Sequence, residues 1–300
     1  MKIAAIDIGS NAARLKIFDV IVNKQKVAEF NKLNFLRIPL RLGFDVFENG
    51  KISEQGITNI VNAMLAFKSL INFYHIKSLK VCATSAMRDA KNSKQVVETV
   101  DNQTGIKITV ISGDEEASLI HENHIAENMD REHGYLHVNV GGGSTDLIFV
   151  ADGKLQYKKS IDIGTIRILK NQVKDRDWNY MKTQLKENIK CNLPLVAIGS
   201  GGNINKIFSL SKKKEGKPLS FGLLNQYYKE LSRLSVEERM HDYGLREDRA
   251  DVIVPALKIY INLLSWANIE KIYVPQIGLA DGLAHALYAE IVNQAQYTRL

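Results

Sequence analysis

The sequence has few cysteines and prolines and contains no long apolar run. Its 300 residues include 2 cysteines and 5 prolines. Two thiols as distant as Cys82 and Cys191 form neither a disulfide framework nor a metal cluster. No stretch approaches the ~18 consecutive apolar residues of a membrane-spanning helix, and Asp7 interrupts the N-terminal segment before a secretory apolar core is complete. We therefore expect a cytoplasmic protein with reduced thiols and no membrane association.

The composition is that of a folded protein with an anionic partner. Hydrophobic residues make up 45% and charged residues 24% of the chain, and its length suggests two domains. The formal net charge of +7 favours a phosphorylated metabolite, polyphosphate or nucleic acid. No basic stretch interleaves with aromatic residues, so we expect no specific nucleic-acid binding. The run Lys212–Lys214 is interpreted as a solvated loop, with contact to a long polyanion as the alternative.

Strand and helix patterns alternate along the first part of the chain. The alternation predicts an α/β fold. The predicted strands are 3–8, 14–22, 79–83 and 106–112; the predicted helices are 53–75, 93–100 and one beginning near 114; turns are predicted at 9–11 and 84–89.

The first strand, turn and returning strand recur later in the chain. The segment 136–150 repeats the opening pattern with an offset of 132 positions, which aligns Asp7 with Asn139 and Gly9 with Gly141. Further strands that run towards glycine are predicted at 195–202 and 272–278. The repeat predicts two similar lobes, 1–125 and 126–300, with a cleft between them where their glycine turns face each other, and it allows the last helix to pack back on the first lobe.

The glycine turns are candidate phosphate ligands, because a strand that ends in Gly, Ser, Thr or Asn leaves backbone N–H groups open to an anion. A tight hairpin turn is the alternative for any single one of them. Arg14 and Arg88 lie close to such polar turns, Arg88 shortly after the hydroxyls of Thr84 and Ser85, and a guanidinium can hold a phosphate bidentately. The candidate residues in the turns are Gly9, Ser10, Asn11, Gly142, Gly143, Ser144, Thr145, Gly201, Gly202 and Asn203.

Acidic residues provide candidates for proton transfer and metal binding. The run Asp114-Glu115-Glu116 starts a predicted helix. Acids at this position complement the helix dipole. The alternative is that one of the two glutamates takes a proton from an attacking water. Asp7 and Asp146 flank the glycine turns, and carboxylates beside phosphate imply Mg²⁺. His121 and His124 are interpreted as helix-surface residues rather than zinc ligands.

Taken together, these motifs resemble the exopolyphosphatase and guanosine pentaphosphate phosphohydrolase family. The resemblance spans nearly the whole chain and implies two ribonuclease H-like lobes of the actin, sugar kinase and heat-shock ATPase superfamily, in a short form without C-terminal helical domains. The segments that carry it are Asp7–Asn11 with Arg14, Ala83–Asn92, Ile111–Ala117, Gly141–Thr145, Gly199–Gly202 and Arg249–Asp251.

The resemblance also implies roles for individual residues. Glu116 would be the general base that activates water, with Glu115 as its substitute, and Arg88, with Thr84 and Ser85, would bind the terminal phosphate. Ser10, Asn11, Arg14 and the segment Gly142–Thr145 would surround that phosphate and the next ones. Mg²⁺, or Mn²⁺ in its place, would be held by Asp7, Glu116, Asn139 and Asp146. The implied substrate is inorganic polyphosphate or guanosine pentaphosphate, the implied product is orthophosphate, and the implied assembly is a homodimer.

The chain departs from the family pattern at the metal positions. Asn139 stands where the family usually has Asp, and Asp146 stands where it usually has Glu. An amide oxygen stabilises a divalent charge less than a carboxylate does. Two alternatives therefore stay open beside a phosphohydrolase: a non-catalytic polyphosphate or nucleotide sensor, and an ATP-using kinase or ATPase of the wider superfamily.

Overall fold

The chain folds into two compact units. The structure, a computed structural model, describes residues 1–25, 27–121, 130–275 and 277–297. Unit 1 comprises residues 1–123 and 279–300, and unit 2 comprises residues 124–278. The predicted boundaries were 1–125 and 126–300, so the last helix belongs with unit 1 in the structure. None of the described helices has the length and apolar character needed to cross a membrane.

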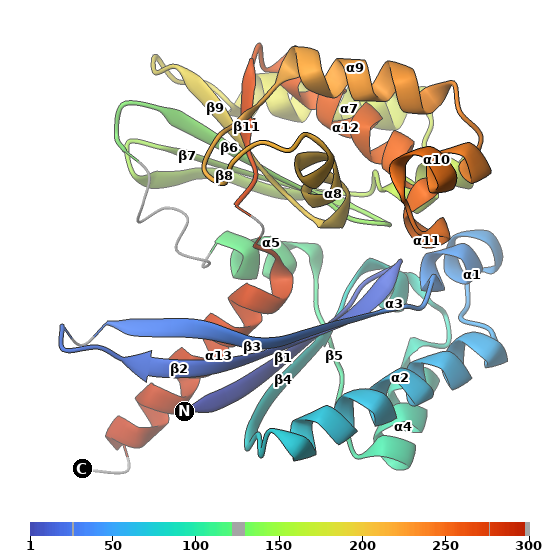
Figure 1. Cartoon of the computed structure of the whole chain (residues 1–300), viewed down its shortest axis with the longest axis vertical. Helices are drawn as coiled ribbons and strands as arrows, with labels where there is room; N and C mark the ends of the chain where they lie inside the picture. The colour runs from blue at the N-terminus through green and yellow to red at the C-terminus, as the bar shows by residue number, and fades with distance from the viewer. Residues whose placement is uncertain (26, 122–129, 276, 298–300) are drawn as a thin grey trace. The chain divides into compact units, whose positions relative to one another are not determined.

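Unit 1 is built around a five-stranded sheet with the order β3-β2-β1-β4-β5 (Figure 1). β1 pairs antiparallel with β2 and parallel with β4. Helix α13 packs against β1, β2 and β4, and helices α2 and α4 pack against each other. The strands are β1 (Lys2–Ile8), β2 (Ala12–Val22), β3 (Ala28–Pro39), β4 (Ser78–Ala83) and β5 (Thr109–Val110); the helices are α1 (Leu42–Asn49), α2 (Glu54–Phe73), α3 (Ser85–Asp89), α4 (Ser93–Thr104), α5 (Gly113–His121) and α13 (Leu279–Tyr297).

Local sequence signals explain the central strand and the long helix of unit 1. Residues 3–8 of β1 are all buried, as expected for a central strand that is covered on both faces. Helix α2 starts after Ser53, whose side chain accepts a hydrogen bond from the amide of Gly56, a standard N-cap. The segment Thr84–Asp89, predicted as a turn, contains the short helix α3 instead.

Unit 2 is built around a six-stranded sheet with the order β10-β11-β9-β6-β7-β8. Helix α12 lies in its apolar core and packs against α6, α7, α8 and α9. The strands are β6 (Gly134–Val140), β7 (Thr145–Ala151), β8 (Lys154–Ile161), β9 (Leu195–Ser200), β10 (Leu219–Ser220) and β11 (Lys271–Tyr273); the helices are α6 (Thr165–Leu169), α7 (Asp175–Asn188), α8 (Gly202–Leu210), α9 (Phe221–Ser232), α10 (Val236–Tyr243), α11 (Glu247–Ala250) and α12 (Ile253–Trp266).

The two sheets share one topology, which is the structural form of the predicted repeat. In both, the first strand pairs antiparallel with the second and parallel with the fourth, and the third strand lies outside the second. The turns also match, because the Gly9 amide donates to the Ala12 carbonyl at 3.0 Å and the Gly141 amide donates to the Ser144 carbonyl at 2.9 Å. These residue pairs differ by the same 132 positions found in the sequence. The prediction of an α/β fold with two lobes of ribonuclease H type is confirmed.

Candidate active site

In unit 1, the ends of two parallel strands bring separate polar segments together. β1 and β4 are in register up to Ile8 and Ala83, so the segment Gly9–Asn11 and the start of α3 begin at the same edge of the sheet. The buried hydroxyls of Ser10 and Ser85 are 2.7 Å apart and share a hydrogen bond. Two sequence-predicted phosphate ligands that are 75 positions apart are therefore in contact.

Asp7 and Arg14 form a close ion pair beneath this edge. They face each other across the β1–β2 ladder, and the Arg14 guanidinium donates to Oδ2 of Asp7 at 2.6 Å. Among the described residues, Oδ1 of Asp7 has no hydrogen-bond partner. Asp7 thus keeps one carboxylate oxygen for a further ligand, while Arg14 holds the other.

Glu116 lies beside Arg88, the second arginine that the sequence singled out. Nη1 of Arg88 and Oε2 of Glu116 are 3.9 Å apart, and the Glu116 side chain is 10% exposed. Arg88 also donates to the carbonyl of Ile111 at 3.0 Å, which anchors its guanidinium near the start of α5. A carboxylate that can accept a proton and a cation that can hold a phosphate therefore lie next to each other in unit 1.

The neighbouring Glu115 has a different, local role. Its carboxylate accepts from the amide of Ser112 at 2.7 Å, and its own amide donates to the Ser112 hydroxyl at 3.1 Å. This reciprocal pair is a capping box at the start of α5. The backbone hydrogen bond from Ser112, followed by its side-chain bond, lowers the pKa of Glu115. The geometry favours Glu116 over Glu115 as the base, because the Glu115 carboxylate is held in the cap at the start of α5.

In unit 2, the carbonyl groups of the triple-glycine turn accept hydrogen bonds from residues of α6. The Gly141 carbonyl accepts from the amide of Thr165 at 3.1 Å, the Gly142 carbonyl accepts from the amide of Ile166 at 2.8 Å, and the Gly143 carbonyl accepts from the Arg167 side chain at 2.7 Å. Within the described chain, the amides of Gly142, Gly143 and Ser144 have no hydrogen-bond partner. Successive amides of this kind form a concavity suited to an anion, as the sequence predicted. Thr145 contributes differently, because its hydroxyl donates to the Ile163 carbonyl at 2.6 Å and is buried.

The third glycine turn leads into α8 and brings in an arginine to which the sequence analysis gave no role. The Arg249 guanidinium donates to Oδ1 of Asn203 at 2.9 Å. A Cβ atom on Gly202 would lie 2.5 Å from this guanidinium, so Gly202 leaves the space that Arg249 fills. Gly201 has φ of 104°, a backbone conformation open to glycine. The helix N-terminus and Arg249 together place positive charge beside the turn. A basic residue 46 positions away in the sequence gave no periodic signal that could link it to Asn203.

The remaining two predicted metal positions, Asn139 and Asp146, face each other across the β6–β7 ladder. The Asn139 amide donates to Oδ2 of Asp146 at 2.9 Å, and the Ser160 hydroxyl donates to Oδ1 at 2.6 Å. Asp146 is 1% exposed. Both of its carboxylate oxygens therefore accept hydrogen bonds from side chains of unit 2.

A comparison with known families shows which one this chain belongs to. A model of the Ppx/GppA phosphatase family matches residues 20–289. The chain belongs to this family. An exopolyphosphatase 1 of Mycobacterium tuberculosis is 23% identical over 94% of this chain and 87% of its own length. A bifunctional 3-dehydroquinate synthase/phosphatase of Fusobacterium nucleatum is 28% identical over 97% of this chain, which spans only 47% of that relative.

Solved structures of Ppx/GppA proteins share the fold. An exopolyphosphatase from Cytophaga hutchinsonii superposes with a TM-score of 0.81 at 22% identity, covering 96% of this chain and 98% of its own. A Ppx/GppA family member from Aquifex aeolicus gives a TM-score of 0.75 at 23% identity, covering 98% of both chains. At these identities the likeness concerns the fold, which is the actin-like α/β architecture.

The metal set expected for a Ppx/GppA protein is divided between the units. Asp7 and Glu116 belong to unit 1, whereas Asn139 and Asp146 belong to unit 2. In the described ranges no three His, Cys, Asp or Glu side chains are grouped to hold a metal ion. In unit 1, Asp7 and Glu116 both raise the pKa of the Cys82 thiol, after the larger effect of its burial, so both carboxylates lie near that residue. His124 and the side chain of His121 lie outside the described residues.

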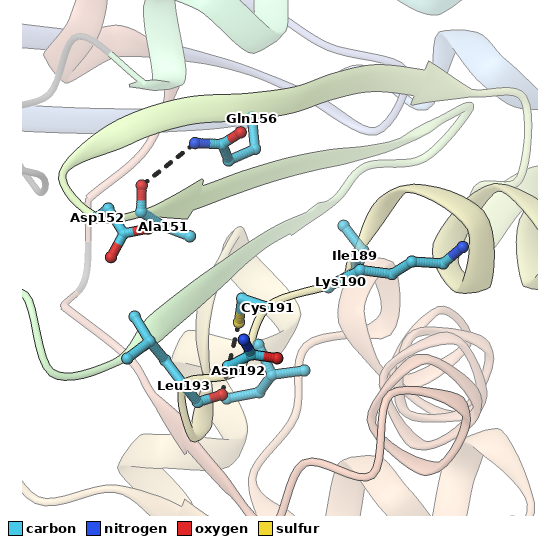
Figure 2. A pocket seen from close by; sticks show the side chains of 9 residues that line it. Ala151, Asp152, Gln156, Ile189, Lys190, Cys191, Asn192 and Leu193 are labelled. Carbon is cyan, nitrogen blue, oxygen red and sulfur yellow. Dashed lines mark hydrogen bonds between the residues drawn. The ribbon is translucent and has the colours of Figure 1, made fainter.

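A hollow of about 770 Å³ in this Ppx/GppA protein lies away from the glycine turns (Figure 2). It is formed by the β7–β8 turn and by the segment before β9, at the opposite end of these strands from Gly142 and Gly201. Figure 2 shows its two internal hydrogen bonds, from Gln156 to the Ala151 carbonyl and from Cys191 to the Leu193 carbonyl. None of the predicted site residues lines this hollow.

Proposed function

We propose that this chain is a phosphohydrolase that releases orthophosphate from the end of inorganic polyphosphate or from guanosine pentaphosphate. Family membership supports a phosphatase, and relatives named as exopolyphosphatase and as guanosine-5'-triphosphate,3'-diphosphate pyrophosphatase, the latter from Aliivibrio fischeri, support the substrate class. The observation that carries the proposal is the buried Glu116 carboxylate beside Arg88, next to a Glu115 that is held in the helix cap.

In the proposed reaction, Glu116 accepts a proton from a water molecule. The oxygen of that water attacks the terminal phosphorus, the bond to the bridging oxygen breaks, and the shortened chain leaves with the electron pair. Phosphoryl transfer requires little covalent work from the protein, so orientation of the water and stabilisation of negative charge supply most of the acceleration. The anchoring of Arg88 by Ile111 keeps its guanidinium beside the base.

Each unit has its own set of proposed phosphate ligands. Ser10, Ser85 and Arg14 in unit 1 are assigned to the phosphates of the substrate, and so are the amides of Gly142 to Ser144 in unit 2. Backbone amides and arginines recognise phosphate oxygens without regard to the base or sugar, which suits a chain of phosphates. We add Arg249 with Asn203 to this set.

We propose Mg²⁺, with Mn²⁺ as its substitute, as the cofactor. The donor chemistry of unit 1 fits, because Mg²⁺ is commonly bound by one or two carboxylates together with substrate phosphates, and Asp7 and Glu116 would hold it. When bound, the ion would neutralise charge on the phosphate oxygens. A cytoplasmic location and a homodimeric assembly complete the proposal.

A phosphate-release assay tests the function directly. The substrates are polyphosphates of several lengths, guanosine pentaphosphate and ATP, each with millimolar Mg²⁺. Glu116→Gln should lower turnover by about 10²–10⁴ with substrate binding nearly unchanged, because the amide keeps the shape and loses the proton acceptor.

Glu115→Gln is the matched control, since a glutamine also serves in a capping box and turnover should stay within about twofold. Full turnover in Glu116→Gln would remove Glu116 from its role. Tight polyphosphate binding without phosphate release by the wild type would identify a sensor, and phosphate transfer from ATP to an acceptor would identify a kinase.

A further inference from the structure

The cross-strand pair beneath the triple-glycine turn differs from its counterpart in the other half of the repeat. The equivalent positions are Asp7 with Arg14 in unit 1 and Asn139 with Asp146 in unit 2, each pair facing across the first two strands of its sheet. In unit 1 the acid is on the first strand and the donor on the second. In unit 2 the donor is on the first strand and the acid on the second, so the hydrogen bond runs in the opposite direction.

The orientation of the Asn139 amide is fixed by its second partner. The Ser200 hydroxyl donates to Oδ1 of Asn139 at 3.0 Å, which leaves Nδ2 to face Asp146. Ser200 is itself within 3.0 Å of Nε2 of His137, and because its single proton goes to Asn139, His137 must donate to it. Along the row His137, Ser200, Asn139 and Asp146, each residue therefore donates a hydrogen bond to the next.

Both carboxylate oxygens of Asp146 accept a hydrogen bond. Nδ2 of Asn139 meets Oδ2 and the Ser160 hydroxyl meets Oδ1, in a site where Asp146 is 1% exposed. A buried carboxylate needs either hydrogen-bond donors or a cation, and this one has the donors. Asp7 differs, since only its Oδ2 has a hydrogen-bond partner among the described residues.

We infer that the Asn139 amide takes the place of a divalent cation beside Asp146, so that unit 2 of this chain holds no metal ion at this pair. The inference does not rest on the proposed hydrolysis, because it concerns only what neutralises Asp146. It revises the expected metal set, leaving Asp7 and Glu116 as the carboxylates available to Mg²⁺.

The geometry also predicts how the Asn139–Asp146 pair could be converted into a metal site. Two adjacent oxygen ligands of an octahedral Mg²⁺ ion lie about 3 Å apart, because each bond is about 2.1 Å long. Nδ2 of Asn139 and Oδ2 of Asp146 are 2.9 Å apart. An oxygen in the position of Nδ2 would thus face Asp146 at the spacing of two ligands of one ion, and Asn139→Asp supplies that oxygen and the missing charge.

Mn²⁺ is the probe for the experiment, which reads metal binding and not turnover. Free Mn²⁺ is measured by electron paramagnetic resonance during titration of the 300-residue chain, and melting temperatures are measured with and without Mn²⁺. Asn139→Asp should gain one Mn²⁺ equivalent and a Mn²⁺-dependent rise in melting temperature of about 5 °C over that of the wild type. No gain in either measurement would overturn the role of the amide.

Asp146→Asn is the second variant, and it tests the wild-type pair even if Asn139→Asp folds poorly. It keeps the size of the side chain and removes its charge. Mn²⁺ affinity should be the same as in the wild type within about twofold, because Asp146 is not a ligand. A loss of about tenfold or more would show that Asp146 binds the ion and would overturn the inference.

Discussion

Adjacent side chains in this protein have opposite chemical surroundings. Glu115 and Glu116 differ by one step along α5, which turns them by about 100° around the helix axis. Ser112 holds the exposed Glu115 in the capping box, whereas Glu116 is buried beside Arg88. The proposal that Glu116 is the proton acceptor therefore rests on the direction of its side chain and not on its residue type.

The two cysteines provide a residue-scale prediction. Burial, against the lowering effect of Lys80 and with smaller contributions from the carboxylates of Asp7, Glu115 and Glu116, raises the pKa of the Cys82 thiol to about 11. At pH 8 its thiolate fraction is about a hundredfold smaller than that of an ordinary thiol, and the thiolate is the reactive form. Mass spectrometry after iodoacetamide treatment at pH 8 should find Cys191, which is half-buried, modified first. Equal rates at the two cysteines would contradict the buried environment of Cys82.

At the scale of elements, α13 and α5 make a very close backbone contact within unit 1. A Cβ atom on Gly282 would overlap the carbonyl oxygen of Leu119. The helices can approach this closely because residue 282 has no side chain. On either side of it, Asp281 accepts two hydrogen bonds from Lys16 of β2, and His285 stacks against Phe30 of β3. Helix α13 is thereby attached to the sheet as well as to α5.

Gly282→Ala should destabilise the protein by about 1–3 kcal/mol, since the overlap forces the two backbones apart. Gly222→Ala is the control, because a Cβ atom there meets no atom within 4 Å and α9 should gain about 0.5–1 kcal/mol from the higher helix propensity of alanine. Urea denaturation measures both changes. Equal free energies of unfolding of the two variants would show that the backbones of α13 and α5 leave room for a side chain at residue 282.

The elements that sequence periodicity predicted are those with buried apolar faces. β1, α2, β4, β6, β7 and β9 were predicted because buried strands and amphipathic helices leave repeating apolar positions. α3 was missed, because five residues are too few for a helical period and because Ser85 and the N-cap residue Thr84 favour turns. β3 was also missed; its residues alternate weakly at the edge of the sheet.

The candidate site was predictable wherever its residues share a short motif. The glycine turns, Arg14, Arg88 and Glu116 each lie within a local pattern, and the repeat linked the two halves. The contact of Arg249 with Asn203 and the row from His137 to Asp146 join strands and helices that are distant in the chain. Such pairings depend on register and on side-chain direction, which a single sequence does not contain.

At the scale of the whole molecule, the net charge of +7 should act on encounter with a polyanion. Salt screens this attraction, so raising NaCl from about 50 to 200 mM should raise KM for polyphosphate by about three- to tenfold with little change in kcat. Steady-state phosphate release measures both constants. A KM independent of salt would mean that long-range charge contributes nothing to binding.

The exposed lysines after α8 give the matched control for this effect. Lys213 and Lys214 lie in a loop and are exposed. If the loop is only solvated, Lys213→Gln with Lys214→Gln should leave KM at 50 mM NaCl within about twofold of the wild type, a variation of the order expected for exposed charges. A larger rise in KM would instead place this loop in contact with the polyanion.

Because α13 follows unit 2 in the chain yet completes unit 1, the order of synthesis separates the two halves. Unit 2 is a continuous stretch of the chain, whereas one face of the first sheet stays uncovered until α13 has been synthesised. Before this helix is made, the nascent chain would expose Ile3 and Phe18, which lie on the same face of the sheet as Lys16, the partner of Asp281. Unit 1 thus begins first and is completed last, after the whole of unit 2 has been made.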